Sequence, residues 1–167
     1  DITVRFADQA PDDFHPRFSS IGKRYVYTLF ASPHPSALSR NQSFHVFRPL
    51  DVGRMQAAAA MLAGQHDFSA FRDVGCEAGT TFRTLHCVTI LPNLPFLRIV
   101  VEGNAFLYHM VRIIAGTMVD IGSGRLPLDR LPGLLAGGER ALAGQTAPAC
   151  GLCLDRVFYG DGFSDAP

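Results

Sequence analysis

Apolar residues along the chain fall into short runs that predict four β-strands. The run from Lys23 to Phe30 is rich in aromatic and β-branched residues, and Pro33 and Pro35 follow and end it. Two further runs are joined by a Pro-Asn-Leu-Pro segment, which indicates a hairpin, and a last run lies near the C-terminus. The predicted strands are Lys23–Phe30, Arg83–Leu91, Phe96–Glu102 and Leu152–Tyr159.

Helical periodicity is strongest in the segment from Ala105 to Ile121. Asn104 precedes this segment as a capping residue, and a glycine-rich turn at Gly122 and Gly124 ends it. The segment is apolar on nearly all sides, so we expect this helix to be buried on most of its surface.

The other helical signals are weaker. Asp51 is expected to cap a helix that Gly64 ends, Asp67 to cap a short helical turn, and Leu128 to Leu135 to form a weaker helix. Strands and helices are grouped rather than alternating, which favours an α+β fold: an antiparallel sheet with helices packed on one face. The 167 residues suit a single domain, and 47% hydrophobic residues can bury a core.

The sequence lacks the short motifs of several enzyme classes. No GxGxxG or Walker pattern occurs, and Ser69 lacks the context of a nucleophile elbow. The longest apolar run, Ala105 to Gly116, is interrupted by His109 and Arg112 and is too short to span a bilayer. No signal-peptide pattern opens the chain, so we expect a cytoplasmic protein with no membrane partner.

The four cysteines are too few for a disulfide scaffold. Cys150 and Cys153 have the CxxC spacing, which leaves a zinc or redox site as an alternative to buried, reduced thiols. A zinc site needs a second pair of ligands, and the residues after Cys150 predict a strand instead of the helix of a thioredoxin motif. We therefore expect buried thiols and no metal.

The formal net charge is zero, but the segment from Phe14 to Leu50 contains no acidic residue. Basic residues alternate there with aromatic residues and histidines. Basic groups neutralise phosphates and aromatic rings stack on unpaired bases, so this combination indicates nucleic-acid binding. A solvated basic surface over ordinary core aromatics is the alternative. The basic residues are Arg17, Lys23, Arg24, Arg40 and Arg48.

The predicted apolar helix contains two polar residues, His109 and Arg112, three positions apart and on one face. A buried guanidinium keeps its charge and needs an anionic partner or water. Either Arg112 extends to solvent, or it faces an active-site carboxylate. Neither Asp120 nor Glu102 is an obvious partner, so the second alternative requires a carboxylate from further sequence.

Tyr25 and Tyr27 share one face of their predicted strand, whereas Arg24 points to the other face. Both tyrosines can belong to the core. Alternatively, one of them is a platform on which a base stacks, with its hydroxyl free to act.

Four segments resemble, in order, motifs of the TruA family of tRNA pseudouridine synthases. FHPRFSS followed by KRYVY is similar to the family's FHARFSA and RYRY, and GQHDFSAFR is similar to GEHDFxxFR. GNAFLYHMVR resembles xxAFLxxMVR, and GLCL resembles GLYL. The segments cover almost the whole chain: residues 14–20 with 23–27, 64–72, 103–112 and 151–154.

The resemblance implies an enzyme that isomerises uridine in the tRNA anticodon arm, usually at tRNA positions 38 to 40, as a homodimer without cofactor or metal. In the family, an aspartate in a GRTDAGVHA motif begins the reaction. That motif does not occur in these 167 residues. We therefore expect residues 1–167 to be a single domain, the C-terminal part of such an enzyme, inactive by itself.

The resemblance also assigns roles to single residues. Tyr25 corresponds to the tyrosine that stacks on the target base, Arg112 to the arginine that pairs with the catalytic aspartate, and Leu152 to an apolar residue of the base pocket. The residues expected to contact RNA are Arg17, Lys23, Arg24 and His109.

One region departs from the family's pattern. Between Gly75 and Arg83 the family often has KSPVRTI, whereas this chain has a different loop, so the role of that loop in RNA contact is left open. Two rival hypotheses also stay open: a non-catalytic RNA-binding module that keeps the fold, and a zinc protein that uses Cys150 and Cys153.

Overall fold

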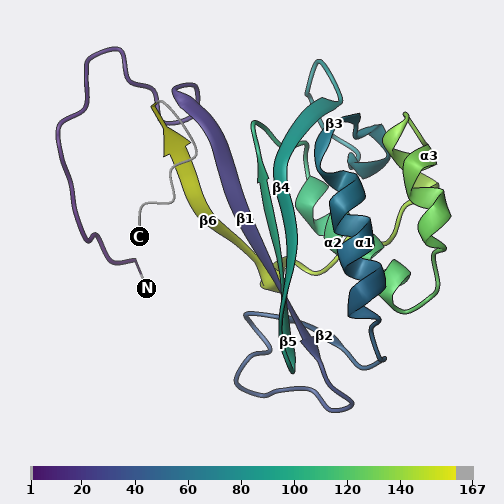
Figure 1. The fold of residues 1–167 in the computed structure, drawn as a ribbon. Coiled ribbons are helices and arrows are strands. Elements are labelled where there is room, and N and C mark those ends of the chain that lie inside the picture. The colour runs from purple at the N-terminus through teal and green to yellow at the C-terminus, as the bar shows by residue number, and fades with distance from the viewer. Residues whose placement is uncertain (1, 161–167) are drawn as a thin grey trace.

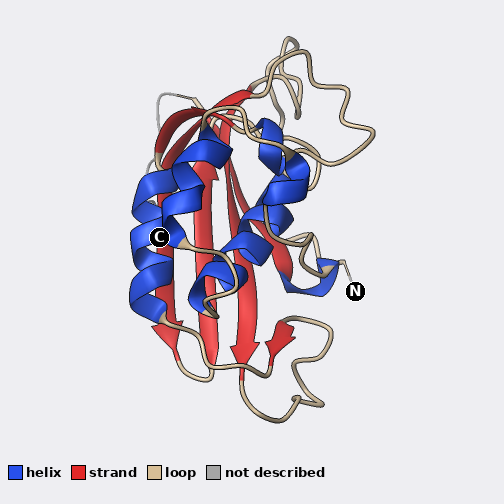
Figure 2. Ribbon diagram, turned by 90° about the vertical axis from the view of Figure 1, so that its right-hand side faces the viewer, coloured by secondary structure: helices blue, strands red, loops and turns tan. Residues whose placement is uncertain are grey.

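Six strands form one sheet, and the helices pack on one of its faces (Figures 1 and 2). The computed structural model describes residues 2–160. The strand order is β2-β1-β5-β4-β3, and β6 also pairs with β1. The strands are β1 (Ser20–Ala31), β2 (Phe44–Val46), β3 (Gly64–Asp67), β4 (Phe82–Asn93), β5 (Phe96–Gly103) and β6 (Leu152–Tyr159). The helices are α1 (Val52–Leu62), α2 (Met110–Gly122) and α3 (Leu131–Leu135).

The strand β1 lies at the centre of this arrangement. It pairs antiparallel with β5 along one edge and with β6 along the other. Because successive side chains of a strand point to opposite faces, Tyr27 and Leu29 are fully buried beneath the helices. Arg24 lies on the opposite, uncovered face. This alternation places the chemically interesting residues of β1 on two different surfaces.

The helix α2 forms the middle of the helical layer. Eleven of its 13 residues are buried, and only Arg112 and Asp120 are partly exposed. The helix α1 packs against α2 and β4, and its N-terminus is capped by Asp51, whose carboxylate accepts a hydrogen bond from the Arg54 backbone N–H at 3.0 Å. Each fully buried aliphatic side chain in this layer stabilises the fold by about 1.5–3 kcal/mol.

Most of the predicted elements are confirmed. All four predicted strands are present; β6 has the predicted bounds, and the others extend the predicted ones by at most three residues at either end. The predicted helix after Asp51 is α1, and the Asp67 carboxylate accepts a hydrogen bond from Ser69 at the start of a short 3₁₀ turn. The α+β class, with helices on one face, is also confirmed.

The predicted antiparallel sheet is confirmed for the four expected strands, and the structure adds a short strand, β2, that runs parallel to β1. Neither β2 nor β3 was expected as a strand. They contain three and four residues, which is too short to show an alternating pattern. Their pairing is decided by where the chain returns to the sheet, and long-range contacts of this kind leave no local signal.

The prediction of a helix from Ala105 to Ile121 places the start of that helix too early in the chain. The helix α2 starts at Met110, and His109 before it has a left-handed backbone with φ 57°. Asn104 does not cap the helix. Its side-chain oxygen accepts hydrogen bonds from the backbone N–H of Thr84 at 3.1 Å and of Ala105 at 2.7 Å. Asn104, which the sequence predicts as the helix cap, therefore forms a tertiary contact with β4 instead.

The cysteine prediction also needs correction. Cys150 and Cys153 are free thiols, but both are exposed instead of buried. Cys150 lies in the turn before β6, and Cys153 lies on the uncovered face of the sheet. Within residues 2–160, no group of three or more His, Cys, Asp or Glu side chains could hold a metal ion. No helix in the same part of the chain is long and apolar enough to cross a membrane.

Candidate active site

A cleft of about 780 Å³ opens beside the N-terminal half of β1. Residues from β1 and from the segment between β5 and α2 line it, together with the N-terminal segment, the loop before β4 and the start of β4. Its lining includes three basic side chains and one acidic side chain, Glu77. The basic, aromatic and histidine side chains of the lining include Arg17, Lys23, Tyr25, Arg83, Phe106 and His109.

Tyr25 forms part of the cleft wall. It is half-buried, and its ring packs edge-on against Phe106, with 5.0 Å between the ring centroids and 81° between the ring planes. Burial raises the pKa of the Tyr25 hydroxyl. Within residues 2–160 this hydroxyl makes no hydrogen bond. Tyr25 is therefore a neutral aromatic side chain in contact with open space.

Tyr27 differs from Tyr25 although both point to the same face of β1. It is fully buried, and its hydroxyl donates a hydrogen bond to the Pro148 carbonyl at 2.6 Å. Burial raises the Tyr27 pKa strongly. A side chain on Gly151 would collide with the Tyr27 ring, so glycine is required there. Of the two tyrosines, Tyr27 belongs to the core and Tyr25 to the cleft.

Arg112 lies in the first turn of α2 and is held by Ala147. Its Nε donates a hydrogen bond to the Ala147 carbonyl at 2.6 Å, and the Ala147 N–H donates to the Arg112 carbonyl at 3.1 Å. Within residues 2–160 the guanidinium forms no ion pair with a carboxylate. Its positive charge lowers the pKa of Tyr27, but burial has a larger effect and raises that pKa. The arginine is thus oriented, but its charge is not neutralised.

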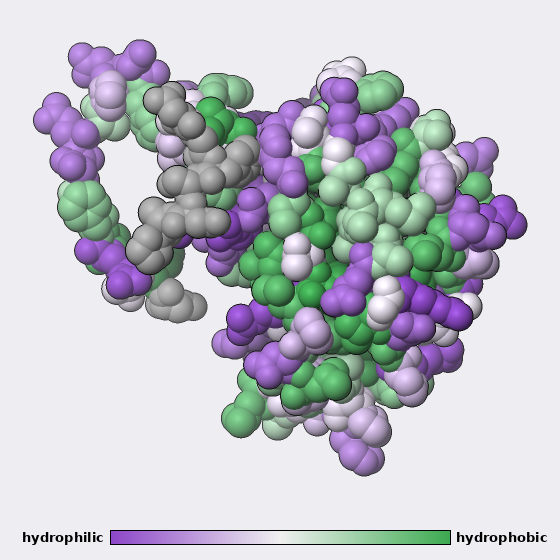
Figure 3. Space-filling model, viewed as in Figure 1, coloured by the Kyte–Doolittle hydropathy of each residue, from purple (hydrophilic) through white to green (hydrophobic). Residues whose placement is uncertain are grey.

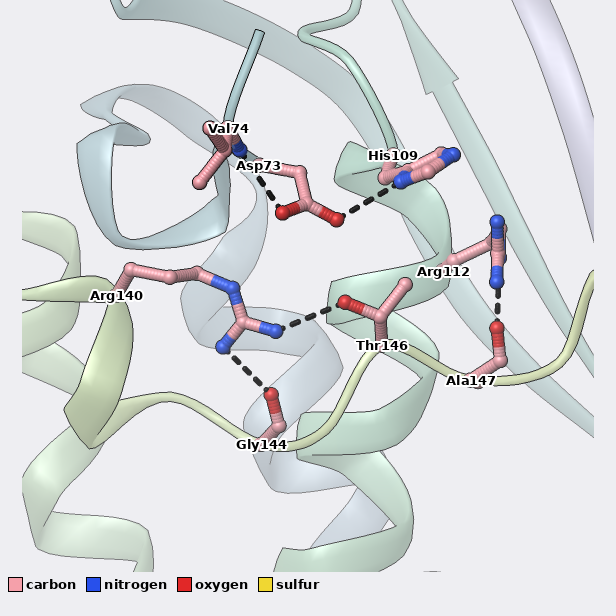
Figure 4. A network of polar contacts seen from close by, with 8 residues as sticks. All are labelled: Asp73, Val74, His109, Arg112, Arg140, Gly144, Thr146 and Ala147. Carbon is pink, nitrogen blue, oxygen red and sulfur yellow. Dashed lines mark hydrogen bonds and ion pairs between the residues drawn. The ribbon is translucent and has the colours of Figure 1, made fainter. Parts of the chain in front are cut away.

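The segment that carries Ala147 lies directly against α2. A side chain on Gly116 would clash with the Gln145 carbonyl, so only glycine lets the two backbones approach. Arg140 fixes the same segment by donating hydrogen bonds to the Gly144 carbonyl and the Thr146 hydroxyl, both at 2.9 Å (Figure 4). The acceptor for Arg112 is therefore positioned by packing as well as by hydrogen bonds.

His109 forms a pair with Asp73 at the cleft. The distance from His109 Nδ1 to Asp73 Oδ2 is 2.8 Å (Figure 4). The Tyr108 ring stacks on the imidazole with a centroid distance of 3.8 Å. The hydrogen bond to His109, and secondly that from the Val74 N–H, lower the pKa of Asp73. Because Nδ1 contacts the carboxylate, Nε2 is left for a ligand.

Leu152 begins β6 and pairs with Tyr27 across the β1–β6 ladder. It is half-buried and packs against the core beside Tyr27. Leu152 and Arg112 therefore lie near Tyr27, whereas His109 lines the cleft with Tyr25. Of the three predicted catalytic residues, Arg112 and Leu152 thus form one group around Tyr27, and Tyr25, two positions earlier in β1, lies in the cleft.

The predicted RNA-binding residues are also divided. Arg17 and Lys23 line the cleft, but Arg24 lies on the other face of β1 and forms ion pairs with Glu102 and Asp155. Arg17 belongs to the N-terminal segment, which runs away from the helices on the far side of β6 (Figures 1 and 3). That segment is fixed to β6 by Tyr159, whose hydroxyl donates to the Pro16 carbonyl at 2.8 Å.

Sequence reasoning missed three residues of this site. Asp73 follows a recognised motif but had no visible partner, because His109 is 36 positions away. Phe106 was expected inside a helix, and Arg83 was treated only as the start of a strand. The sole signal available was the basic character of Arg83 next to a loop that departs from the family's pattern.

Comparison with known proteins agrees with the motifs. Residues 58–160 match the family model for tRNA pseudouridine synthase. The chain is 43% identical over 160 residues to tRNA pseudouridine synthase A of Ruminiclostridium cellulolyticum, and 46% identical over 159 residues to that of Geotalea uraniireducens. Each of these alignments covers 95% of this chain.

The chain belongs to the tRNA pseudouridine synthase family. Its resemblance to the TruA type is confirmed, because the similar proteins carry the name tRNA pseudouridine synthase A. A more distant member from Alcanivorax borkumensis is 40% identical over 164 residues. The chain spans 65% of the length of the first two family members and 61% of the third.

Proposed function

We propose that this chain forms the RNA-binding cleft and part of the active site of an enzyme that converts uridine to pseudouridine in the tRNA anticodon arm, usually at positions 38 to 40. The observation that carries the proposal is the neutral aromatic ring of Tyr25 in a basic cleft, while Arg112, near the neighbouring Tyr27, has no carboxylate partner within residues 2–160. The name of the similar proteins supports the same reading.

The reaction explains why such a cleft is needed. The bond between the ribose and N1 of the uracil breaks, the base rotates, and the ribose bonds to C5, whose proton is released while N1 gains one. The product is an isomer of the substrate, so no oxidant or reductant is consumed. The base must leave the helical stack to react, and an aromatic side chain in a basic groove can receive it.

Tyr25 is the side chain to which we assign base stacking. Because burial raises its pKa, the hydroxyl is protonated at neutral pH, which favours stacking over a resting phenolate. Leu152 supplies an apolar surface close by, and Arg17, Lys23 and His109 supply charge or hydrogen bonds for the RNA backbone.

The attacking carboxylate is assigned to a part of the protein outside these 167 residues. Arginine stays protonated, and tyrosine ionises only near pH 10, so neither Arg112 nor Tyr25 is a nucleophile for the ribose. The absence of a carboxylate partner for Arg112 within residues 2–160, and the greater length of the similar proteins, support this assignment.

Tritium release from uracil-labelled tRNA tests the proposal. The isolated 167-residue chain is expected to fold and form no pseudouridine, whereas the full-length protein is expected to turn over. Turnover by the isolated chain would contradict the outside carboxylate and direct attention to Asp67 and Asp120. Specific tRNA binding without turnover by the full-length protein would instead favour a non-catalytic RNA-binding module.

Two further expectations from the family remain proposals. We propose that the full-length protein is a homodimer, which sedimentation equilibrium would decide. We also propose a cytoplasmic location, because its tRNA substrate is found there, and cell fractionation would test it.

A further inference from the structure

Among the three basic side chains that line the cleft, Arg83 lies across the sheet from Lys23. The strands β1 and β4 flank β5, whose Gly103 pairs with Lys23 on one side and with Leu85 on the other. Arg83 precedes Leu85 by two residues and so lies on the same face of the sheet. Neighbouring strands are about 4.8 Å apart, which separates β1 from β4 by roughly 10 Å. Lys23 and Arg83 therefore stand on two sides of one cleft.

The hydrogen bonds of Arg83 are incomplete. Its Nε is buried and has no hydrogen-bond partner within residues 2–160. Its Nη1 donates to the adjacent Phe82 carbonyl at 2.6 Å, and the guanidinium forms no ion pair in the same part of the chain. Buried polar groups are nearly always satisfied, and charged ones most of all. An unsatisfied guanidinium at a cleft therefore indicates a missing anionic ligand.

The surroundings of Arg83 favour an anion. Glu77 is the sole acidic side chain among the described lining residues, and it is exposed. The positive field also reaches into the cleft. The pKa of the Cys76 thiol is lowered mainly by the Tyr108 backbone N–H, and the charges of Arg72 and Arg83 add to that effect. A guanidinium presents its donors in a planar fork that matches two phosphate oxygens.

We propose that Arg83 binds a phosphate of the RNA, so that Lys23 and Arg83 hold the backbone on two sides of the nucleotide that stacks on Tyr25. Phosphate contacts set the position of a nucleic acid on a protein, and an extruded base needs its backbone held while it is out of the stack. This inference rests on the proposed function. It assigns an RNA contact to the region around β4, whose role the sequence left open.

The salt dependence of tRNA binding tests this inference. Affinities of the full-length protein for an unmodified tRNA transcript are measured at a series of salt concentrations. Arg83→Gln is expected to reduce the slope of log affinity against log salt by about 1, since one phosphate contact is lost. The matched control is Arg98→Gln, because Arg98 is exposed on the opposite face of the same sheet and forms no ion pair within residues 2–160.

The outcomes separate the two proposals. An unchanged slope for Arg83→Gln, or an equal reduction for Arg98→Gln, contradicts the phosphate contact. If thermal melting shows that Arg83→Gln is not folded, Arg83→Lys is measured instead. This variant keeps the charge and loses the planar fork, so the affinity for tRNA should fall while the salt slope stays unchanged. An unchanged affinity contradicts the inference. Failure of the full-length protein to form pseudouridine, with these slopes as expected, contradicts only the proposed function.

Discussion

Lys23 and Arg24 are adjacent in β1, but the two faces of the sheet give them different surroundings. On the uncovered face, Arg24 Nε lies 2.6 Å from Glu102 Oε1, and Arg24 Nη1 lies 3.8 Å from Asp155 Oδ2. On the cleft face, Lys23 Nζ contacts only the neutral Ser20 hydroxyl, at 3.2 Å, among the described residues. One basic side chain is neutralised within the protein, and the other keeps its charge for a ligand.

This difference shows what a basic run in a sequence can mean. Strand alternation sends neighbouring charges to opposite faces, and the strands β5 and β6 supply carboxylates on only one of them. A paired arginine contributes to the fold, whereas an unpaired lysine in a cleft attracts phosphates. Ligand binding should therefore depend on Lys23 more than on Arg24.

The largest effect is expected at Arg112, another basic residue on the helix side without a carboxylate partner within residues 2–160. In the full-length protein, Arg112→Ala should lower turnover by about 100- to 1000-fold, as expected when a buried ion pair loses one partner. The tRNA affinity should change little. Arg112→Lys should restore only part of the rate, because an ammonium cannot form the planar fork.

Tritium release and equilibrium tRNA binding, measured on the same preparations, test this prediction. Arg54→Ala is a suitable control, since Arg54 is exposed and pairs with Asp51 at the start of α1. Parallel losses of affinity and turnover in Arg112→Ala would assign Arg112 to binding alone.

The second effect tests the two faces directly. Lys23→Glu should weaken tRNA binding about tenfold and reduce its salt slope by about 1. Arg24→Glu should act mainly on stability, because it faces Glu102 and Asp155 with a like charge. Arg130→Glu, at an exposed position in the helical layer, should change neither. Equal losses of affinity from the Lys23 and Arg24 changes would remove the distinction between the faces.

A smaller effect separates the two tyrosines. Tyr27→Phe should lower the free energy of unfolding by about 1 kcal/mol, because the buried Tyr27 side chain loses its hydrogen bond to the Pro148 carbonyl. Tyr25→Phe removes no hydrogen bond within residues 2–160 and should leave stability nearly unchanged. Urea unfolding of both variants measures the difference. A larger loss for Tyr25→Phe would place Tyr25 in the core.

The smallest effect concerns the pair of Asp73 and His109. The pKa of Asp73 is lowered in the folded protein, so its ionised form stabilises the fold above the unfolded pKa of about 3.9. That contribution is lost as the pH falls through the lowered pKa. Asp73→Asn should therefore cost about 1 kcal/mol or less at pH 7, and the cost should vanish in acid. Urea unfolding between pH 7 and pH 3 tests this, and a cost independent of pH would contradict it.

The sequence by itself determined the elements with strong local signals. Periodicity and turn residues located β1, β4, β5, β6 and α1, because a strand or helix that buries one face must repeat its apolar residues at a fixed period. The motifs also identified the family, and the roles that they predict for Tyr25 and Arg112 stay predictions. The start of α2 could not be located in this way, since Asn104 is equally suited to cap a helix and to bond Thr84 in β4.

Only the tertiary structure decided which side chains share a surface. It distinguished Tyr25 from Tyr27 by the position of the segment around Pro148, and Lys23 from Arg24 by the carboxylates of β5 and β6. It also joined His109 to Asp73 and placed Arg83 across the cleft from Lys23. These relations depend on packing between residues that are distant in sequence, and the local pattern of apolar and polar positions contains no information about such partners.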